Sequence, residues 1–160
     1  MNLMNKLRAF LSFNWKTKRM LFESYLYLGW ARYLKSIPFS KVAPSLGDQM
    51  KETTFDFHSS NKEVLSSISQ TIHIMSRYTF WESQCLVKAI AAMKMLEKRQ
   101  IESTLYLGTA KDETGELIAH AWLRSGPFYI TGSEGMKKFT IVGKFAKEVS
   151  YEKVEGERNG

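Results

Sequence analysis

The chain has 160 residues, of which 44% are hydrophobic and 13% aromatic, and this length supports one hydrophobic core but hardly two domains. Its single cysteine, Cys85, excludes an internal disulfide and a cysteine-based zinc site. The three histidines lack metal-ligand spacing, and no dinucleotide-binding or P-loop motif is present. We therefore expect no metal and no cofactor, so any catalysis must rely on side chains.

The formal net charge of +7 lies in the first part of the chain. Residues 1–45 contain eight basic residues and one acidic residue, whereas the rest of the chain contains 15 of each. We therefore divide the expected single domain into a basic, aromatic helical region (1–45), a core (46–147) and a flexible charged tail (148–160). No cleavage-site pattern of a secretory signal precedes Cys85, which favours a cytoplasmic location.

The first predicted helix covers residues 17–37, where apolar and aromatic residues recur at helical spacing before Pro38. Glu23 and Arg32 interrupt the apolar run, which argues against a transmembrane span. This helix either packs on the core or uses its aromatic face, flanked by Lys and Arg, to contact a membrane surface or a partner. Residues 39–60 are predicted to be a connecting segment.

Two more helices and a sheet are predicted from residue 60 onward. Ser60 and Glu63 form a capping-box pattern before a helix over 61–78, and another helix begins near Ser83 and ends near Arg99. The hydrophobic period then changes to that of strands, which we place at residues 103–110, 116–124, 128–131 and 139–143. Helices followed by an antiparallel sheet indicate an α+β fold.

Cys85 and His120 are the residues best suited to chemistry. With Ser83 as N-cap, Cys85 lies in the first turn of its helix, where unpaired backbone amides favour the thiolate. His120 lies on a strand with apolar neighbours on both faces, as in a buried central strand. Either residue alone is commonly structural, but this combination forms the thiolate–imidazolium pair of thiol peptidases and transglutaminases.

A third group is expected to orient the imidazole. If the turn after the histidine strand is centred on Gly126, the residue opposite His120 is Gly132, which has no side chain. The nearest carboxylate is that of Glu134, which reaches the ring only if a bulge or a loop folds it back. A backbone carbonyl or a water molecule would serve the same purpose, so the third member stays open.

Three segments carry a resemblance to a known family: FWESQCLVKA (80–89), LYLG (105–108) and AHAWL (119–123). They resemble the stand-alone peptidase halves of the B proteins of lasso-peptide biosynthesis, which are transglutaminase-like. The resemblance continues into residues 139–142 and the basic N-terminal helices, and so covers nearly the whole chain.

The resemblance implies a papain/transglutaminase-like core with the nucleophile at a helix N-terminus. Cys85 takes the family's position of nucleophile and His120 that of base, whereas many members carry an Asp about where Gly132 stands here. By ordinary thiol-peptidase logic the Cys85 amide, with the Gln84 side chain as a weaker candidate, holds the oxyanion.

The same resemblance implies a substrate and partners. The enzyme would remove the leader from a ribosomally made precursor, freeing the amine that a separate ATP-dependent macrolactam cyclase joins to an acidic side chain. Fused members carry a winged-helix leader-recognition domain before the peptidase, and the helical N-terminus here lacks its strands. A separate leader-binding protein is therefore implied. Trp81 and Trp122 are weaker candidates for the peptide groove, since packing in the core suits at least one of them.

Two alternatives stay open. A Cys-His pair does not choose between water and an amine as acceptor, so transglutaminase-like acyl transfer is the first. The second is a non-catalytic module whose basic N-terminus binds anionic lipid or nucleic acid. No helix-turn-helix or RNP-like pattern indicates specific nucleic-acid recognition. The basic helices also suit an acidic leader, or the leader-binding partner, through charge.

Overall fold

The computed structural model describes residues 3–149, so the predicted tail (148–160) lies almost wholly outside the described residues. The longer helices are α1 (Leu3–Ser12), α2 (Trp15–Lys35), α4 (Lys62–Met75) and α5 (Cys85–Glu97). Short helical segments are α3 (Phe39–Val42), η1 (Ala43–Leu46), η2 (Ser59–Asn61) and η3 (Met136–Lys138). The strands are β1 (Asp48–Gln49), β2 (Ser103–Lys111), β3 (Leu117–Ser125), β4 (Phe128–Thr131) and β5 (Thr140–Lys147).

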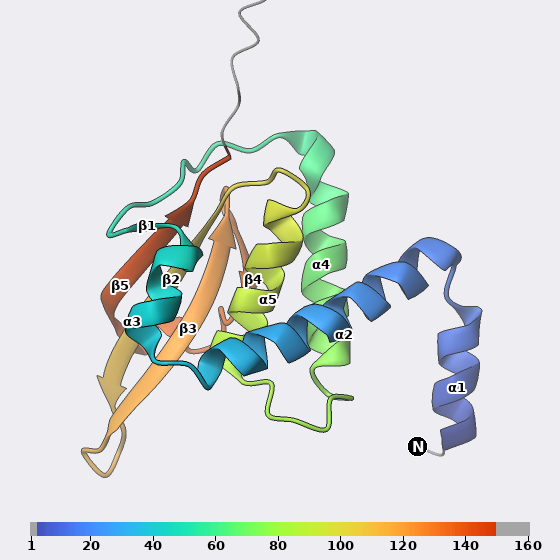
Figure 1. The fold of residues 1–160 in the computed structure, drawn as a ribbon, viewed down its shortest axis with the longest axis horizontal. Helices are drawn as coiled ribbons and strands as arrows, with labels where there is room; N and C mark the ends of the chain where they lie inside the picture. Colours follow the sequence, from blue (N-terminus) through green and yellow to red (C-terminus); the bar gives the residue numbers. More distant parts are fainter. Residues whose placement is uncertain (1–2, 150–160) are drawn as a thin grey trace, which may run out of the picture.

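The five strands form one antiparallel sheet in the order β1-β5-β2-β3-β4. Helices α4 and α5 pack on one face of this sheet, and α2 crosses over both of them as a further layer (Figure 1). The prediction of an α+β fold with an antiparallel sheet is confirmed.

Helix α5 is the central helix of the fold. Its apolar residues are not confined to one stripe, and eight of its 13 residues are buried between α2, α4 and the sheet. The inner face of the sheet meets it with Leu105, Ala121 and Leu123, which belong to the same hydrophobic core. Burial on all sides fixes α5, and with it Cys85 at its first residue, relative to β3.

The outer face of the sheet is closed by the coil 50–57 and a buried arginine. Arg124 is only 1% exposed, and its guanidinium donates hydrogen bonds to the backbone carbonyls of Thr53 (2.8 Å), Thr54 (3.1 Å) and Gly126 (2.8 Å). Its Nε donates to the hydroxyl of Tyr106 at 2.9 Å. A buried cation thus ties the coil to β2 and β3.

Tyr106 completes this network. Its hydroxyl donates to the carboxylate of Glu52, and its ring stacks on Trp122 with centroids 5.6 Å apart. Burial, followed by the hydrogen bond to Glu52, raises the pKa of Tyr106 to about 12. The hydrogen bond from Tyr106, aided by Lys144 and Arg124, in turn lowers the pKa of Glu52 below its ordinary value.

The N-terminal half of the chain departs from the sequence prediction in two places. The predicted connecting segment 39–60 contains α3, η1, η2 and strand β1, which pairs with β5. The capping box at Ser60 is wrong, because this serine lies in η2 and the N-cap of α4 is Asn61, which makes no side-chain cap hydrogen bond.

The C-terminal strands also differ from prediction. The last strand was predicted to end at residue 143, but β5 continues to Lys147 because β1 and β2 pair with it on either side. The predicted burial of the histidine strand on both faces holds only for the second half of β3, since Leu117 is 74% exposed and Ala119 is exposed.

Candidate active site

Cys85 is the first residue of α5 and is half-buried. The prediction of Ser83 as N-cap is wrong: Gln84 occupies that position, and its side chain forms no cap hydrogen bond. The Ser83 hydroxyl instead pairs with that of Thr79 at 2.8 Å and fixes the loop before α5. Because no side chain caps the helix at Gln84, the first amides of α5 remain free to bind a thiolate or an oxyanion.

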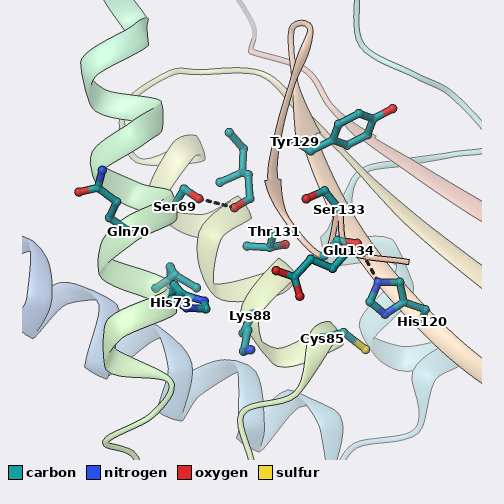
Figure 2. A pocket seen from close by; sticks show the side chains of 13 residues that line it. Ser69, Gln70, His73, Cys85, Lys88, His120, Tyr129, Thr131, Ser133 and Glu134 are labelled. Carbon is teal, nitrogen blue, oxygen red and sulfur yellow. Dashed lines mark hydrogen bonds between the residues drawn. The ribbon is translucent and has the colours of Figure 1, made fainter. Parts of the chain in front are cut away.

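His120 projects from β3, and its ring orientation is set by the main chain. Its Nε2 lies 2.8 Å from the carbonyl oxygen of Gly132. A carbonyl oxygen only accepts hydrogen bonds, so Nε2 must carry the hydrogen, and in the neutral ring Nδ1 then holds the free lone pair. In Figure 2 the ring nitrogen that does not bind Gly132 is turned toward the sulfur of Cys85.

Two aromatic rings pack beside the imidazole. The ring centroid of His120 lies 5.0 Å from that of Phe139 and 5.8 Å from that of Trp122. Gly108 pairs with His120 on β2, and a Cβ there would lie 2.9 Å from both the Trp122 ring and the Phe139 Cβ. The absence of a side chain at Gly108 therefore lets the two aromatic residues approach the imidazole.

Gly132 can only be a glycine in this backbone. Its φ is +72°, and a Cβ would lie 2.4 Å from the Ala121 carbonyl oxygen and 2.9 Å from the Trp122 Cβ. An aspartate, or any other residue with a side chain, therefore cannot stand here without moving β3. The backbone carbonyl of Gly132 supplies the hydrogen bond to His120, which is one of the arrangements that the sequence left open.

The predicted register of the β3–β4 hairpin is wrong. Leu123 pairs with Thr131 whereas Arg124 pairs with Tyr129, so β4 contains a bulge of one residue. The strand ends at Thr131, and Gly132 is not in the ladder opposite His120. The bulge and the turn after it bring the Gly132 carbonyl, rather than a side chain, to the imidazole.

Cys85 and His120 line the same cavity, which has a volume of about 460 Å³ and lies between α4, the start of α5 and the segment after β4 (Figure 2). No hydrogen bond joins the thiol to the imidazole among residues 3–149. In ligand-free enzymes such bonds are often long and tighten when substrate binds. Cys85 and His120, which are 35 residues apart in the sequence, thus line one site.

Further polar groups line this cavity: Ser69, Gln70, His73, Lys88, Thr131, Ser133 and Glu134. Lys88 lies one turn after Cys85 on α5, and no ion pair to it occurs within the described part of the chain. The hydroxyl of Thr131 is buried without a hydrogen-bond partner. Sequence reasoning did not point to either residue, because a lysine on a helix and a threonine on a strand carry no special pattern.

The weaker site candidates lie in different environments. Glu134 lines the cavity and is exposed, but within residues 3–149 it forms no hydrogen bond with His120. Trp81 packs on α2, 5.0 Å from the Tyr25 ring, and Trp122 is 4% exposed. Gln84 is exposed. The cavity lining includes neither tryptophan nor Gln84, so their roles at the site stay predictions.

A comparison with family models matches residues 33–144 to the transglutaminase-like superfamily, and the match includes Cys85 and His120. The chain belongs to the transglutaminase-like superfamily. Chemistry of the cysteine-peptidase or acyl-transfer type is typical of this superfamily, and the helix-start cysteine and strand histidine fit it. No curated protein and no solved structure gives a significant match to the chain.

In residues 3–149, no group of three or more His, Cys, Asp or Glu side chains is placed to hold a metal ion. Over the same residues, no helix combines the length and the apolar character needed to cross a bilayer.

Proposed function

We propose that this transglutaminase-like protein is a cysteine peptidase that removes the leader from a ribosomally synthesised lasso-peptide precursor. It acts with a separate winged-helix leader-binding protein and upstream of an ATP-dependent macrolactam cyclase. The observation that carries the proposal of peptidase chemistry is the meeting of Cys85 and His120 in one cavity, with Nδ1 of the imidazole free to take the thiol proton. The lasso-precursor substrate rests on the sequence resemblance.

The reaction begins with proton transfer from the Cys85 thiol to Nδ1 of His120. The thiolate then attacks the carbonyl carbon of the last leader residue, and the negative oxygen of the tetrahedral intermediate is held by amides at the start of α5. His120 returns the proton to the leaving amine, which departs as the new N-terminus of the core peptide.

Water completes the cycle. His120 accepts a proton from a water molecule while the oxygen of that water attacks the thioester carbon. The Cys85 thiolate then leaves and takes the proton back from His120. The products are the leader with a free carboxylate and the core peptide with a free amine. Throughout, the Gly132 carbonyl keeps the hydrogen on Nε2 and holds the ring in one orientation.

The proposal is tested with the precursor and the leader-binding protein. Cys85→Ala and His120→Ala should each lower turnover by roughly 10⁴-fold or more, because nucleophile and base act as a unit. His58→Ala, which alters an exposed histidine outside the cavity, is the matched control and should retain activity. Mass spectrometry identifies the products: a cross-linked or cyclised product in place of two hydrolysed fragments would establish acyl transfer instead.

A second experiment needs no precursor. Because Cys85 is the only cysteine, alkylation by iodoacetamide reports on a single thiol. His120→Ala should slow alkylation at neutral pH by about 10-fold, since the imidazole no longer accepts the thiol proton. Equal alkylation rates in His120→Ala and wild type would show that the two residues do not form a pair, whatever the substrate.

A further inference from the structure

Helix α1 is amphipathic and is not part of the hydrophobic core. All of its described side chains, residues 4–12, are exposed, including Met4 (70%), Leu7 (57%) and Leu11 (61%). Figure 1 shows α1 standing apart from the sheet and from α4 and α5, joined to the body by the turn into α2. The core described above is complete without it.

The side chains of α1 are arranged in a way that suits a lipid interface. At about 100° per residue, Met4, Leu7 and Leu11 fall on one arc of the helix, and Phe10 extends that arc. Lys6 lies at one edge of the arc and Arg8 at the other. Long basic side chains at the two edges of an apolar face can reach phosphate groups while the face itself enters the acyl region.

The start of α2 adds to the positive charge. Lys16, Lys18 and Arg19 follow α1 directly, and no acidic residue precedes Glu23. Within residues 3–149 neither Arg8 nor Arg19 forms an ion pair, and the pair of Lys16 with Glu63 is long, 3.6 Å, and exposed. Trp15, at the junction of the two helices, is 75% exposed. Tryptophan is favoured at membrane–water interfaces.

We propose that α1 and the first turns of α2 (residues 4–19) bind the surface of an anionic lipid bilayer. The apolar arc of α1 enters the boundary between headgroups and acyl chains, and Lys6 and Arg8 bind lipid phosphates on either side. This inference is independent of the proposed peptidase function, since it uses no residue of the cavity.

The same surface suits other occupants less well. A second copy of the chain would place the two sets of basic residues against one another, which is repulsive. Nucleic acid offers phosphates but no apolar phase for Met4, Leu7 and Leu11. An anionic bilayer is complementary to both the charge and the apolar arc.

The position of α1 brings this surface near the loop that leads to the nucleophile. The ammonium of Lys6 lies 5.2 Å from the ring centroid of Tyr78, in the loop between α4 and α5. Phe80 in this loop is 89% exposed. Binding through α1 would therefore hold the loop before Cys85 close to the lipid headgroups.

Vesicle binding by the full chain tests the proposal. Wild type should sediment with vesicles of phosphatidylcholine containing about 30% phosphatidylglycerol, and much less with phosphatidylcholine alone. Lys6→Gln/Arg8→Gln should weaken binding about 30-fold, and added salt should weaken it further. Leu7→Gln/Leu11→Gln should abolish the binding that remains at high salt.

Matched controls separate a local effect from one of net charge or folding. Lys41→Gln/Lys111→Gln removes two exposed basic residues outside residues 4–19 and makes the same change in net charge, so it should bind like wild type. Cys85→Ala should also bind like wild type, which distinguishes failure of this proposal from failure of the peptidase proposal. Circular dichroism checks that each variant is folded.

Three results with vesicles or DNA would overturn the proposal. They are equal sedimentation with neutral and anionic vesicles, equal weakening by Lys41→Gln/Lys111→Gln and Lys6→Gln/Arg8→Gln, and retention on DNA without any sedimentation with vesicles. The last result would assign the basic surface to nucleic acid. Binding of the leader-binding protein that requires Leu7 and Leu11, with no vesicle binding, would assign it to that partner.

Discussion

The two faces of the sheet are held by different interactions. On the inner face, Leu105 and Leu123 pack against the helices as part of an apolar core. On the outer face, a buried Arg124 and the stacked rings of Tyr106 and Trp122 hold the coil 50–57. Apolar packing is insensitive to pH and tolerates substitutions that conserve volume, whereas a buried polar network depends on every partner.

The difference bears on the candidate site because His120 belongs to the outer face. His120, Trp122 and Arg124 alternate along β3 with the core residues Ala121 and Leu123, so they share one side of the strand. The imidazole therefore lies at the end of a row of aromatic and polar groups. We infer that the outer face positions the base, whereas the inner face positions Cys85 through α5.

The largest expected effect is that of removing Arg124, the buried cation of the outer face. Arg124→Met should lower the free energy of unfolding by about 3–5 kcal/mol, because Tyr106 and the carbonyls of Thr53, Thr54 and Gly126 lose a buried charged partner. Leu105→Ala on the inner face should cost about 2–5 kcal/mol through the cavity it leaves. Denaturant titration measures both.

Arg124→Met and Leu105→Ala should differ in their effect on catalysis. Of the variants that remain folded, Arg124→Met should lower turnover more than Leu105→Ala, since only the former loosens the row that ends at His120. Equal turnover at matched stability would show that the outer face does not position the base.

A sharper test changes the orienting carbonyl without touching charge. Gly132→Ala should lower kcat/KM by about 100-fold, because the new Cβ forces the Gly132 carbonyl away from His120. Gly135→Ala is the matched control: its φ is +71°, but no atom lies within 4 Å of the new Cβ. Both variants bear the cost of an alanine in the left-handed region, so only the difference between them reports on the imidazole.

The outer face should contribute to the pH dependence of stability at both the acid and the alkaline end. Glu52 has a lowered pKa, so its contribution is present above pH 4.5 and is lost as the pH falls through the folded value. Tyr106 has a pKa raised to about 12, so its contribution is present below pH 10.0 and is lost as the pH rises toward 12.

Tyr106→Phe tests the alkaline part of this pH dependence, because it removes the titrating hydroxyl. In thermal melts from pH 8 to about 12, the variant should lose less stability above pH 10.0 than wild type does. Identical alkaline profiles would mean that the Tyr106 hydroxyl is not held in its protonated form by the fold.

The smallest expected effect concerns Glu134. An orienting carboxylate in a catalytic triad contributes about 10⁴-fold to kcat. Because the Gly132 carbonyl already binds Nε2, we expect Glu134→Gln to lower kcat by less than about 10-fold. A loss of kcat near 10⁴-fold would instead make Glu134 the third catalytic residue. The Gly132 carbonyl would then contribute little to orienting the imidazole.

Much of the fold could be predicted because the hydrophobic periods are strong. The helices around 61–78 and 83–99 and the strands in 103–131 were predicted within a few residues. Strand β1 and the extension of β5 to Lys147 are missed, because pairing between distant strands stabilises them rather than local pattern.

The site was only partly predictable for similar reasons. Cys85 and His120 carry local signals, a helix start and an apolar strand, and the structure brings them to one cavity. The Gly132 carbonyl reaches the imidazole through a bulge and a left-handed turn, and no side-chain pattern marks a carbonyl. Arg124 was also missed, because arginine is rarely buried and its partners here are mostly backbone atoms.

The hydrogen bond from His120 to the main chain limits which sequence changes can alter the candidate site. A carbonyl bears no formal charge and never titrates, so the activity should show no acid limb arising from a third carboxylate. The hydrogen bond to this carbonyl is also retained in any variant that preserves the backbone at Gly132. The tautomer of the base is thus protected from most point mutations, and only those that move the turn at Gly132 can release it.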